Sequence, residues 1–101
     1  ESRRKRVPGY DWCIVRLGTA GRITRVEVDT SFFRGNYPES CLLEGGDGTD
    51  WRELMSMQSL QAHTRHVFAD EVVDLGPVTH VRFNIYPDGG VSRLRLYGRI
   101  A

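Results

Sequence analysis

The sequence predicts an all-β domain, an antiparallel β-sandwich or barrel, on three observations. Short runs rich in β-forming residues recur along the 101-residue chain, and several of them alternate apolar with polar side chains. Segments of glycine, proline, asparagine and aspartate separate these runs. Almost no segment has the period of a helix. A chain of this length holds one hydrophobic core, so residues 1–101 are expected to form a single domain of six or seven strands.

The first two predicted strands occupy residues 12–17 and 22–29. The first is a dense apolar run, which is typical of a largely buried strand. The second alternates valines with charged residues, as a half-buried strand does. The glycine-flanked segment between them is predicted to turn the chain. Because Ile23 falls out of the alternation, a bulge is expected near Thr24.

The middle of the chain gives weaker signals. Residues 30–38 have no clean period and contain Gly, Asn and Pro, which indicates a structured loop. Residues 40–44 are predicted to form a short strand, and residues 66–69 another. The sequence between residues 51 and 60 is weakly helical and lacks good helix stop and start signals, so a single helical turn or irregular structure is expected there.

The C-terminal part has the clearest pattern. Residues 78–86 place apolar side chains on one face and His80, Arg82 and Asn84 on the other, which we expect to face solvent rather than a concave site. Residues 91–97 alternate in the same way. The Pro-Asp-Gly-Gly segment between them has the composition of a tight turn. The two runs are therefore predicted to pair as a hairpin.

A closed jelly roll has about eight strands, so one or two strands are missing or unrecognised in this prediction. The abrupt, charged start at residues 1–6 indicates that the chain was cut from a longer protein with the loss of an N-terminal strand. The basic run at residues 3–6 is expected to be a solvated, partly mobile terminus. No apolar region follows it, as a secretory leader would require.

Charge and composition exclude several classes of partner. The net charge of +1 comes from 14 basic and 13 acidic residues, so the chain has no long-range attraction for polyanions. It shows no basic face with stacking aromatics, and we expect no nucleic-acid partner. The longest apolar stretches are a few residues, too short to span a membrane. A soluble, cytoplasmic protein is the expectation.

Histidines and cysteines show no recognised metal-binding motif. His63 and His66 are three residues apart in a segment without a helical period, and no His-Glu-x-x-His pattern is present. Cys13 lies inside an apolar run, where a thiol behaves as a small hydrophobic group, so a disulfide framework or zinc site is not expected. A metal stays an open alternative, and manganese with oxygen and nitrogen ligands is the form it would take.

Five segments, in order, resemble the allantoicase repeat: ESRR at 1–4, PGYDW at 8–12, VRLG at 15–18, VDTSFFRGNYP at 28–38 and YPDGGVSRLRLYG at 86–98. Residues 45–78 have no strong match. The first segment departs from the Glu-Thr-Arg-Arg of the family by one short hydroxyl residue. The resemblance implies a galactose-binding-like jelly roll that occurs as two tandem copies in a homo-oligomeric enzyme. A site built between repeats or subunits would then be incomplete in one repeat.

The resemblance also implies an activity, the hydrolysis of allantoate to ureidoglycolate and urea in purine (allantoin) degradation. Allantoate carries a carboxylate and two ureido groups on one carbon. Its hydrolysis needs a group that activates water and donors that hold the substrate, with or without a metal. Loops held by a rigid scaffold commonly supply such groups.

The loop that follows residues 22–29 holds most of the candidate site residues. Asp29 is the expected catalytic residue, and the expected substrate-binding residues are Thr30, Phe33, Arg34, Asn36, Arg82 and Asp88. On spacing alone, the favoured alternative is that the loop polar groups satisfy turn amides and that a phenylalanine plugs the sandwich end. The resemblance shifts the balance towards a site that includes Asp29 and Asn36.

A second class of function stays open, because a fold does not determine an activity. Galactose-binding-like sandwiches also serve as non-catalytic ligand-binding or structural modules. A carbohydrate-binding module would expose aromatic side chains on its loops, and Phe32, Phe33 and Tyr37 are available for that role.

Overall fold

The computed structural model describes residues 2–7, 10–33, 35, 38–86 and 90–100, with side chains from residue 11 onwards. These residues form antiparallel strands and no helix: β1 (Ser2–Val7), β2 (Tyr10–Asp29), β3 (Ser40–Gly46), β4 (Trp51–Ser59), β5 (Arg65–Phe68), β6 (Val78–Tyr86) and β7 (Arg93–Ile100). The predicted all-β, antiparallel class is confirmed. Within the described part of the chain, no helix has the length and apolar character needed to cross a bilayer.

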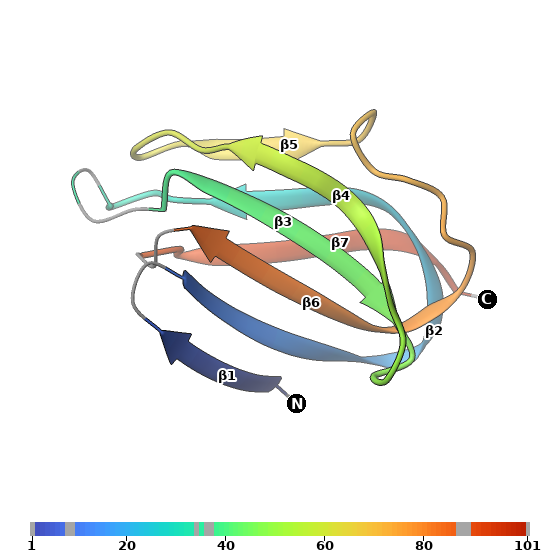
Figure 1. Cartoon of the computed structure of the whole chain (residues 1–101). Coiled ribbons are helices and arrows are strands. Elements are labelled where there is room, and N and C mark those ends of the chain that lie inside the picture. The colour runs from blue at the N-terminus through green and yellow to red at the C-terminus, as the bar shows by residue number, and fades with distance from the viewer. Residues whose placement is uncertain (1, 8–9, 34, 36–37, 87–89, 101) are drawn as a thin grey trace.

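The long strand β2 belongs to both layers of a sandwich (Figure 1). Its first half pairs with β1 and β6, and its second half with β5 and β7. One layer therefore has the order β1-β2-β6-β3-β4, and the other is built by β5 and β7 on either side of β2. The predicted turn at residues 18–21 is wrong: the segment is a bend inside one strand, marked by a register shift between Arg16 and Gly21.

The bulge expected near Thr24 is confirmed. Ile23 lies opposite Gly98 and Arg25 lies opposite Tyr97, so the register of β2 with β7 skips Thr24. Gly98 is required at this irregular point, because a Cβ atom there would collide with the Arg22 carbonyl oxygen.

The predicted hairpin of the two C-terminal runs is wrong. β6 lies between β2 and β3 in one layer, whereas β7 pairs with the second half of β2 in the other. The predicted apolar face of β6 is confirmed, because Val81, Phe83 and Ile85 are all buried. A period of two determines which side chains share a face, but it does not determine the partner strand.

Two strands lie where none was predicted. β4 occupies the segment that was expected to be helical or irregular, and register shifts against β3 bury two consecutive residues, Leu54 and Met55. Those shifts break the alternation that would have revealed the strand. The basic run at residues 3–6 lies in β1, which pairs with β2, and is not an irregular terminus. These two elements supply strands that the sequence analysis did not recognise.

The hydrophobic core lies between the two layers. Its buried side chains come from β2 to β6 and from Leu60, and β7 adds partly buried leucines. Cys41 is fully buried there, and burial raises the pKa of its thiol to about 12, so the thiol stays protonated at neutral pH. Both cysteines are free thiols.

Candidate functional site

Three connecting segments meet at one end of the sandwich, to the left in Figure 1. Backbone hydrogen bonds join them: Thr30 N–H donates to the Thr64 carbonyl (2.9 Å), and Ser92 N–H donates to the Asp29 carbonyl (2.8 Å). His63 N–H donates to the Phe33 carbonyl at 3.0 Å. The loop that follows β2, which the sequence analysis singled out, is thus held in place by the segments that precede β5 and β7.

Asp29 is the last residue of β2, and its carboxylate faces out of the sandwich because the preceding Val28 is buried in the core. Its Oδ1 accepts a hydrogen bond from the Ser31 N–H at 2.8 Å. Hydrogen bonds from the Ser31 hydroxyl and backbone lower the pKa of Asp29, and Arg93 and Arg65 lower it further. Asp29 is therefore an oriented, ionised carboxylate at neutral pH.

A shallow pocket of about 90 Å³ surrounds this carboxylate on the outer face of the β5-β2-β7 layer. Its lining consists of Glu27, Asp29, Arg65, Arg93 and Arg95. A wider depression at the opposite end of the layer includes Arg22 and Asp74, but these two already form an ion pair at 3.3 Å. The pocket around Asp29 is thus the better candidate, because it joins the predicted carboxylate to three arginines that have no ion pair of 4.0 Å or less within the described part of the chain.

Thr30 is fully buried and serves the scaffold. Its hydroxyl donates to the Gln61 carbonyl at 2.6 Å and accepts from the Thr64 N–H at 3.0 Å. These bonds fasten the loop after β2 to the segment before β5. Thr30 therefore follows Asp29 directly in the sequence, but its hydroxyl points into the protein and is occupied by these two hydrogen bonds.

Thr30→Val is expected to destabilise the fold by about 1–3 kcal/mol, because the Gln61 carbonyl and the Thr64 N–H lose the hydroxyl partner that the buried Thr30 provides. Thr30→Ser keeps the hydroxyl and is expected to cost clearly less. Unfolding by guanidinium chloride measures both free energies. Equal losses for the two variants would contradict the importance of these hydrogen bonds.

The two phenylalanines of this loop have different surroundings. Phe33 is partly buried and its ring lies against Gly90, where any side chain would collide with it. Phe32 is 86% exposed, has a φ of 73°, and donates its N–H to His63 Nδ1 at 2.8 Å. A positive φ is uncommon for a bulky residue. Phe33 thus packs against the segment that precedes β7, and Phe32 presents an exposed aromatic ring at this end of the sandwich.

Arg82 lies on the outer face of the other layer and is not brought together with Asp29. Its guanidinium donates from Nε and Nη2 to the two carboxylate oxygens of Glu44, at 2.8 and 3.0 Å, and lies 4.6 Å from the Trp51 ring centroid. Asn84 is 1% exposed and donates to Glu44 and to the Leu42 carbonyl. The expected solvent-facing position is wrong for Asn84, because β3 lies beside β6 and supplies these acceptors.

The Arg82–Glu44 pair predicts an acid-sensitive contribution to stability. The Arg82 hydrogen bonds lower the pKa of Glu44, so the stabilisation is present above the unfolded-state pKa of about 4.3 and is lost as pH falls through the folded-state pKa. Glu44→Gln is expected to cost about 1–2 kcal/mol at pH 7 and much less near pH 3. Guanidinium chloride unfolding at both pH values measures this, with the exposed neighbour Glu53→Gln as control. If the difference in unfolding free energy between wild type and Glu44→Gln did not change with pH, the Arg82–Glu44 pair would not be the source of the acid sensitivity.

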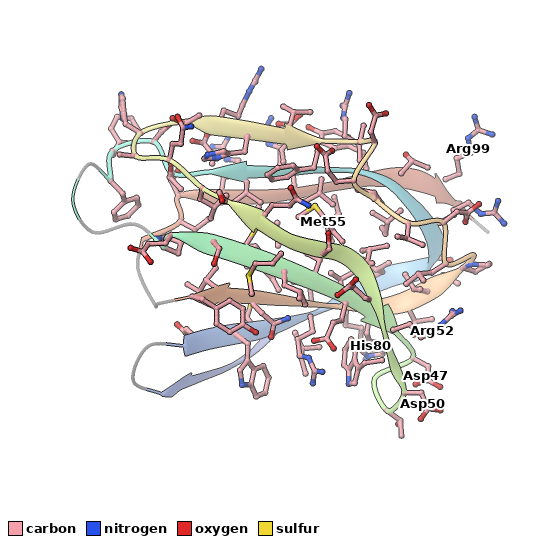
Figure 2. All side chains as sticks on the ribbon, turned by 45° about the horizontal axis from the view of Figure 1, so that its top comes forward. Asp47, Asp50, Arg52, Met55, His80 and Arg99 are labelled. Carbon is pink, nitrogen blue, oxygen red and sulfur yellow. The ribbon has the colours of Figure 1, made fainter. Side chains whose placement is uncertain are left out.

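The histidines do not converge on a metal site. His66 lies at the loop end, where Nδ1 donates to the Val28 carbonyl (3.0 Å) and Nε2 accepts from the Gln61 N–H (2.9 Å). His80 lies in the other layer, beside the turn that carries Asp47 and Asp50 (Figure 2). Among the described residues, no three His, Cys, Asp or Glu side chains are placed to hold a metal ion. These residues therefore do not fit a manganese site.

Three predicted site residues, Arg34, Asn36 and Asp88, lie outside the described residues and stay predictions. Four residues of the pocket were not predicted from the sequence: Glu27, Arg65, Arg93 and Arg95. Their signal was present, because Arg93 and Arg95 fall on the polar side of an alternating run. Only the pairing of β5 and β7 with β2 brings that side next to Asp29.

The two layers, with the long strand shared between them, define the class of protein: a galactose-binding-like β-sandwich. The C-terminal domain of a chitobiase from Bacteroides fragilis shares this fold, with a TM-score of 0.74 and 16% identity over 99% of this chain and 74% of that one. The model of the allantoicase repeat matches residues 1–101. The chain belongs to the allantoicase family, so the resemblance noted in its sequence is confirmed.

Relatives in this family are longer proteins. A probable allantoicase from Stutzerimonas stutzeri is 53% identical over 99% of this chain and 34% of its own length. The crystal structure of allantoicase from Saccharomyces cerevisiae has a TM-score of 0.80 and 37% identity, and the match covers 95% of this chain and 30% of that one. The chain thus spans about a third of the length of the relatives it matches.

Proposed function

We propose that this chain is one repeat of an allantoicase and supplies part of the site that hydrolyses allantoate to ureidoglycolate and urea. Membership of the family supports the substrate. The observation that carries the placement of the site is the ionised carboxylate of Asp29, oriented by Ser31 in a pocket with three arginines. That pocket combines an acceptor for N–H and O–H groups with donors for a carboxylate.

In this proposal, Asp29 orients the attacking water. The water oxygen forms a bond to the central carbon of allantoate, the bond from that carbon to one ureido nitrogen breaks, and the water proton passes by way of the carboxylate to the departing urea. The lowered pKa makes Asp29 a weak base at neutral pH. Its larger contribution is therefore electrostatic, the stabilisation of positive charge that develops on the central carbon as urea leaves.

The wider setting follows from the same proposal. The remaining two-thirds of the length of the relatives leaves room for a second repeat, and we expect that repeat and a homo-oligomer to complete the site. A cytoplasmic location agrees with two free thiols in a small domain that has no disulfide.

A non-catalytic ligand-binding or structural role is the second candidate. The observation that favours it is Phe32, an 86% exposed ring held at the loop end in a conformation that bulky residues rarely adopt. A binding module uses such a ring as a platform for a ligand. In this case the repeat would bind allantoate, or complete the site of its partner, without releasing urea.

The test is urea release from allantoate, with and without Mn²⁺. The 101-residue chain is compared with a chimera in which it replaces the matching third of the Stutzerimonas stutzeri protein. We expect the chimera to release urea and ureidoglycolate in equal amounts, whether or not the isolated chain does. A folded chimera that releases no urea, beside an active parent protein, would overturn the proposal and favour the binding module.

A further inference from the structure

We propose that Arg65, Arg93 and Arg95 form a carboxylate-binding subsite on the outer face of the β5-β2-β7 layer, while Asp29 and Glu27 accept hydrogen bonds from ureido N–H groups of the same ligand. The identity of the ligand as allantoate rests on the proposed function. The existence of a site for a small ligand with both a carboxylate and N–H donors rests on the geometry alone.

Strand register brings these five side chains together. Asp29 in β2 lies opposite Arg93 in β7 and opposite Arg65 in β5, and Glu27 lies opposite Arg95. Directly opposite residues of antiparallel strands share a face. The strands that flank β2 are roughly 10 Å apart, so the guanidinium groups of Arg65 and Arg93 can reach one small ligand from both sides. Asp29 lies beneath that ligand.

The arginines of this pocket are available for a ligand. Among the described residues, Arg65, Arg93 and Arg95 make no hydrogen bond or ion pair with a carboxylate. Other arginines do: Arg82 is paired with Glu44, and Arg22 with Asp74. The pocket holds three guanidinium groups and two carboxylates, so one positive charge is left over, and a ligand with a single carboxylate group balances it.

The mixture of charges defines the class of ligand. A guanidinium group binds a carboxylate through two parallel hydrogen bonds. Asp29 and the largely buried Glu27, which lies 4.0 Å from Arg25, disfavour a simple anion or a polyanion but accept N–H groups. A small carboxylate that also bears amide or ureido N–H groups satisfies both halves of the pocket. Allantoate has this combination.

The first experiment is an NMR titration of the arginine Nε–H signals of the 101-residue chain. The probes are allantoate, its carboxamide analogue and inorganic sulfate. We expect allantoate to shift the signals of the pocket arginines, and Arg93→Gln and Arg65→Gln to weaken its binding about tenfold or more each. Arg93→Lys keeps the positive charge but loses the planar guanidinium group. Its affinity for allantoate is expected to lie between that of the two glutamine variants and that of wild type. The carboxamide analogue should bind weakly and be insensitive to Arg93→Gln.

Arg99→Gln is the matched control. Arg99 lies on the same face of β7 as Arg93 and Arg95 and also lacks a carboxylate partner among the described residues, but it projects at the opposite end of the strand (Figure 2). Its replacement is expected to leave allantoate binding unchanged. The exposed positions of Arg93 and Arg65 allow folding of all variants, which the amide spectrum checks.

Four outcomes separate this inference from the proposed function. Weaker allantoate binding in the arginine variants, without urea release by the chimera, supports the subsite and overturns the function. Urea release by the chimera with an unchanged KM in Arg93→Gln and Arg65→Gln overturns the subsite and leaves the function standing. Sulfate binding as strong as allantoate binding, or no allantoate binding by either the wild-type chain or the wild-type chimera, also overturns the subsite.

Discussion

Asp29→Asn in the chimera is expected to lower kcat for urea release by a factor of about 100 or more, and to raise KM by a smaller factor because an acceptor for the ureido N–H groups is weakened. The asparagine keeps the shape and one oxygen that can accept from Ser31 N–H, so the loop is preserved. The negative charge beside the reacting carbon is lost, and groups that act on charge or protons in the transition state contribute about 10²–10⁴-fold. Steady-state kinetics of urea release measure both constants.

Asp47→Asn is the matched control for this prediction. Asp47 is an exposed aspartate that holds the β3–β4 turn by accepting from the N–H groups of Thr49 and Asp50, at 2.9 and 2.8 Å. It lies at the other end of the molecule from the loop cluster (Figure 2). Its variant is expected to keep wild-type kcat. If Asp29→Asn also kept its activity, Asp29 would be a turn residue only, as the sequence alone favoured.

Leu43→Ala is expected to destabilise the domain by about 3–5 kcal/mol, the cost of removing a large side chain from a packed core. Leu43 is fully buried on β3, between Phe83 of β6 and Met55 of β4. Small domains have only about 5–15 kcal/mol of stability in total. Guanidinium chloride unfolding is therefore expected to show a midpoint shifted strongly downwards.

Leu42→Ala removes the same group from the adjacent position, which faces out of the sandwich and is partly exposed. It is expected to cost less than half as much as Leu43→Ala, because less apolar surface returns to water and a smaller cavity forms. Equal costs at the two positions would show that β3 does not have the burial pattern described above.

The candidate site was predictable in part. Asp29 was identifiable because it ends an alternating strand and opens a polar loop without a clean period. Arg65 and Arg93 were not identifiable, although each lies in a recognisable strand or beside one. Alternation shows which side chains share a polar face, but it does not show which other strands lie next to that face. Arg82 was predicted to bind substrate, but its guanidinium group is hydrogen-bonded to Glu44. Glu44 is 38 residues away in the chain, and only the pairing of β3 with β6 brings the two side chains together.

The sequence by itself determined the fold class, the buried faces of β2 and β6, and the bulge near Thr24, because these depend on side-chain alternation within one strand. Local bulges hid β4, since they place Leu54 and Met55 on the buried side in succession. Only the tertiary structure decided that β2 runs unbroken through both layers and that β7 pairs with β2 instead of β6. Strand pairing depends on contacts between segments far apart in the chain, and those same contacts assemble the arginines around Asp29.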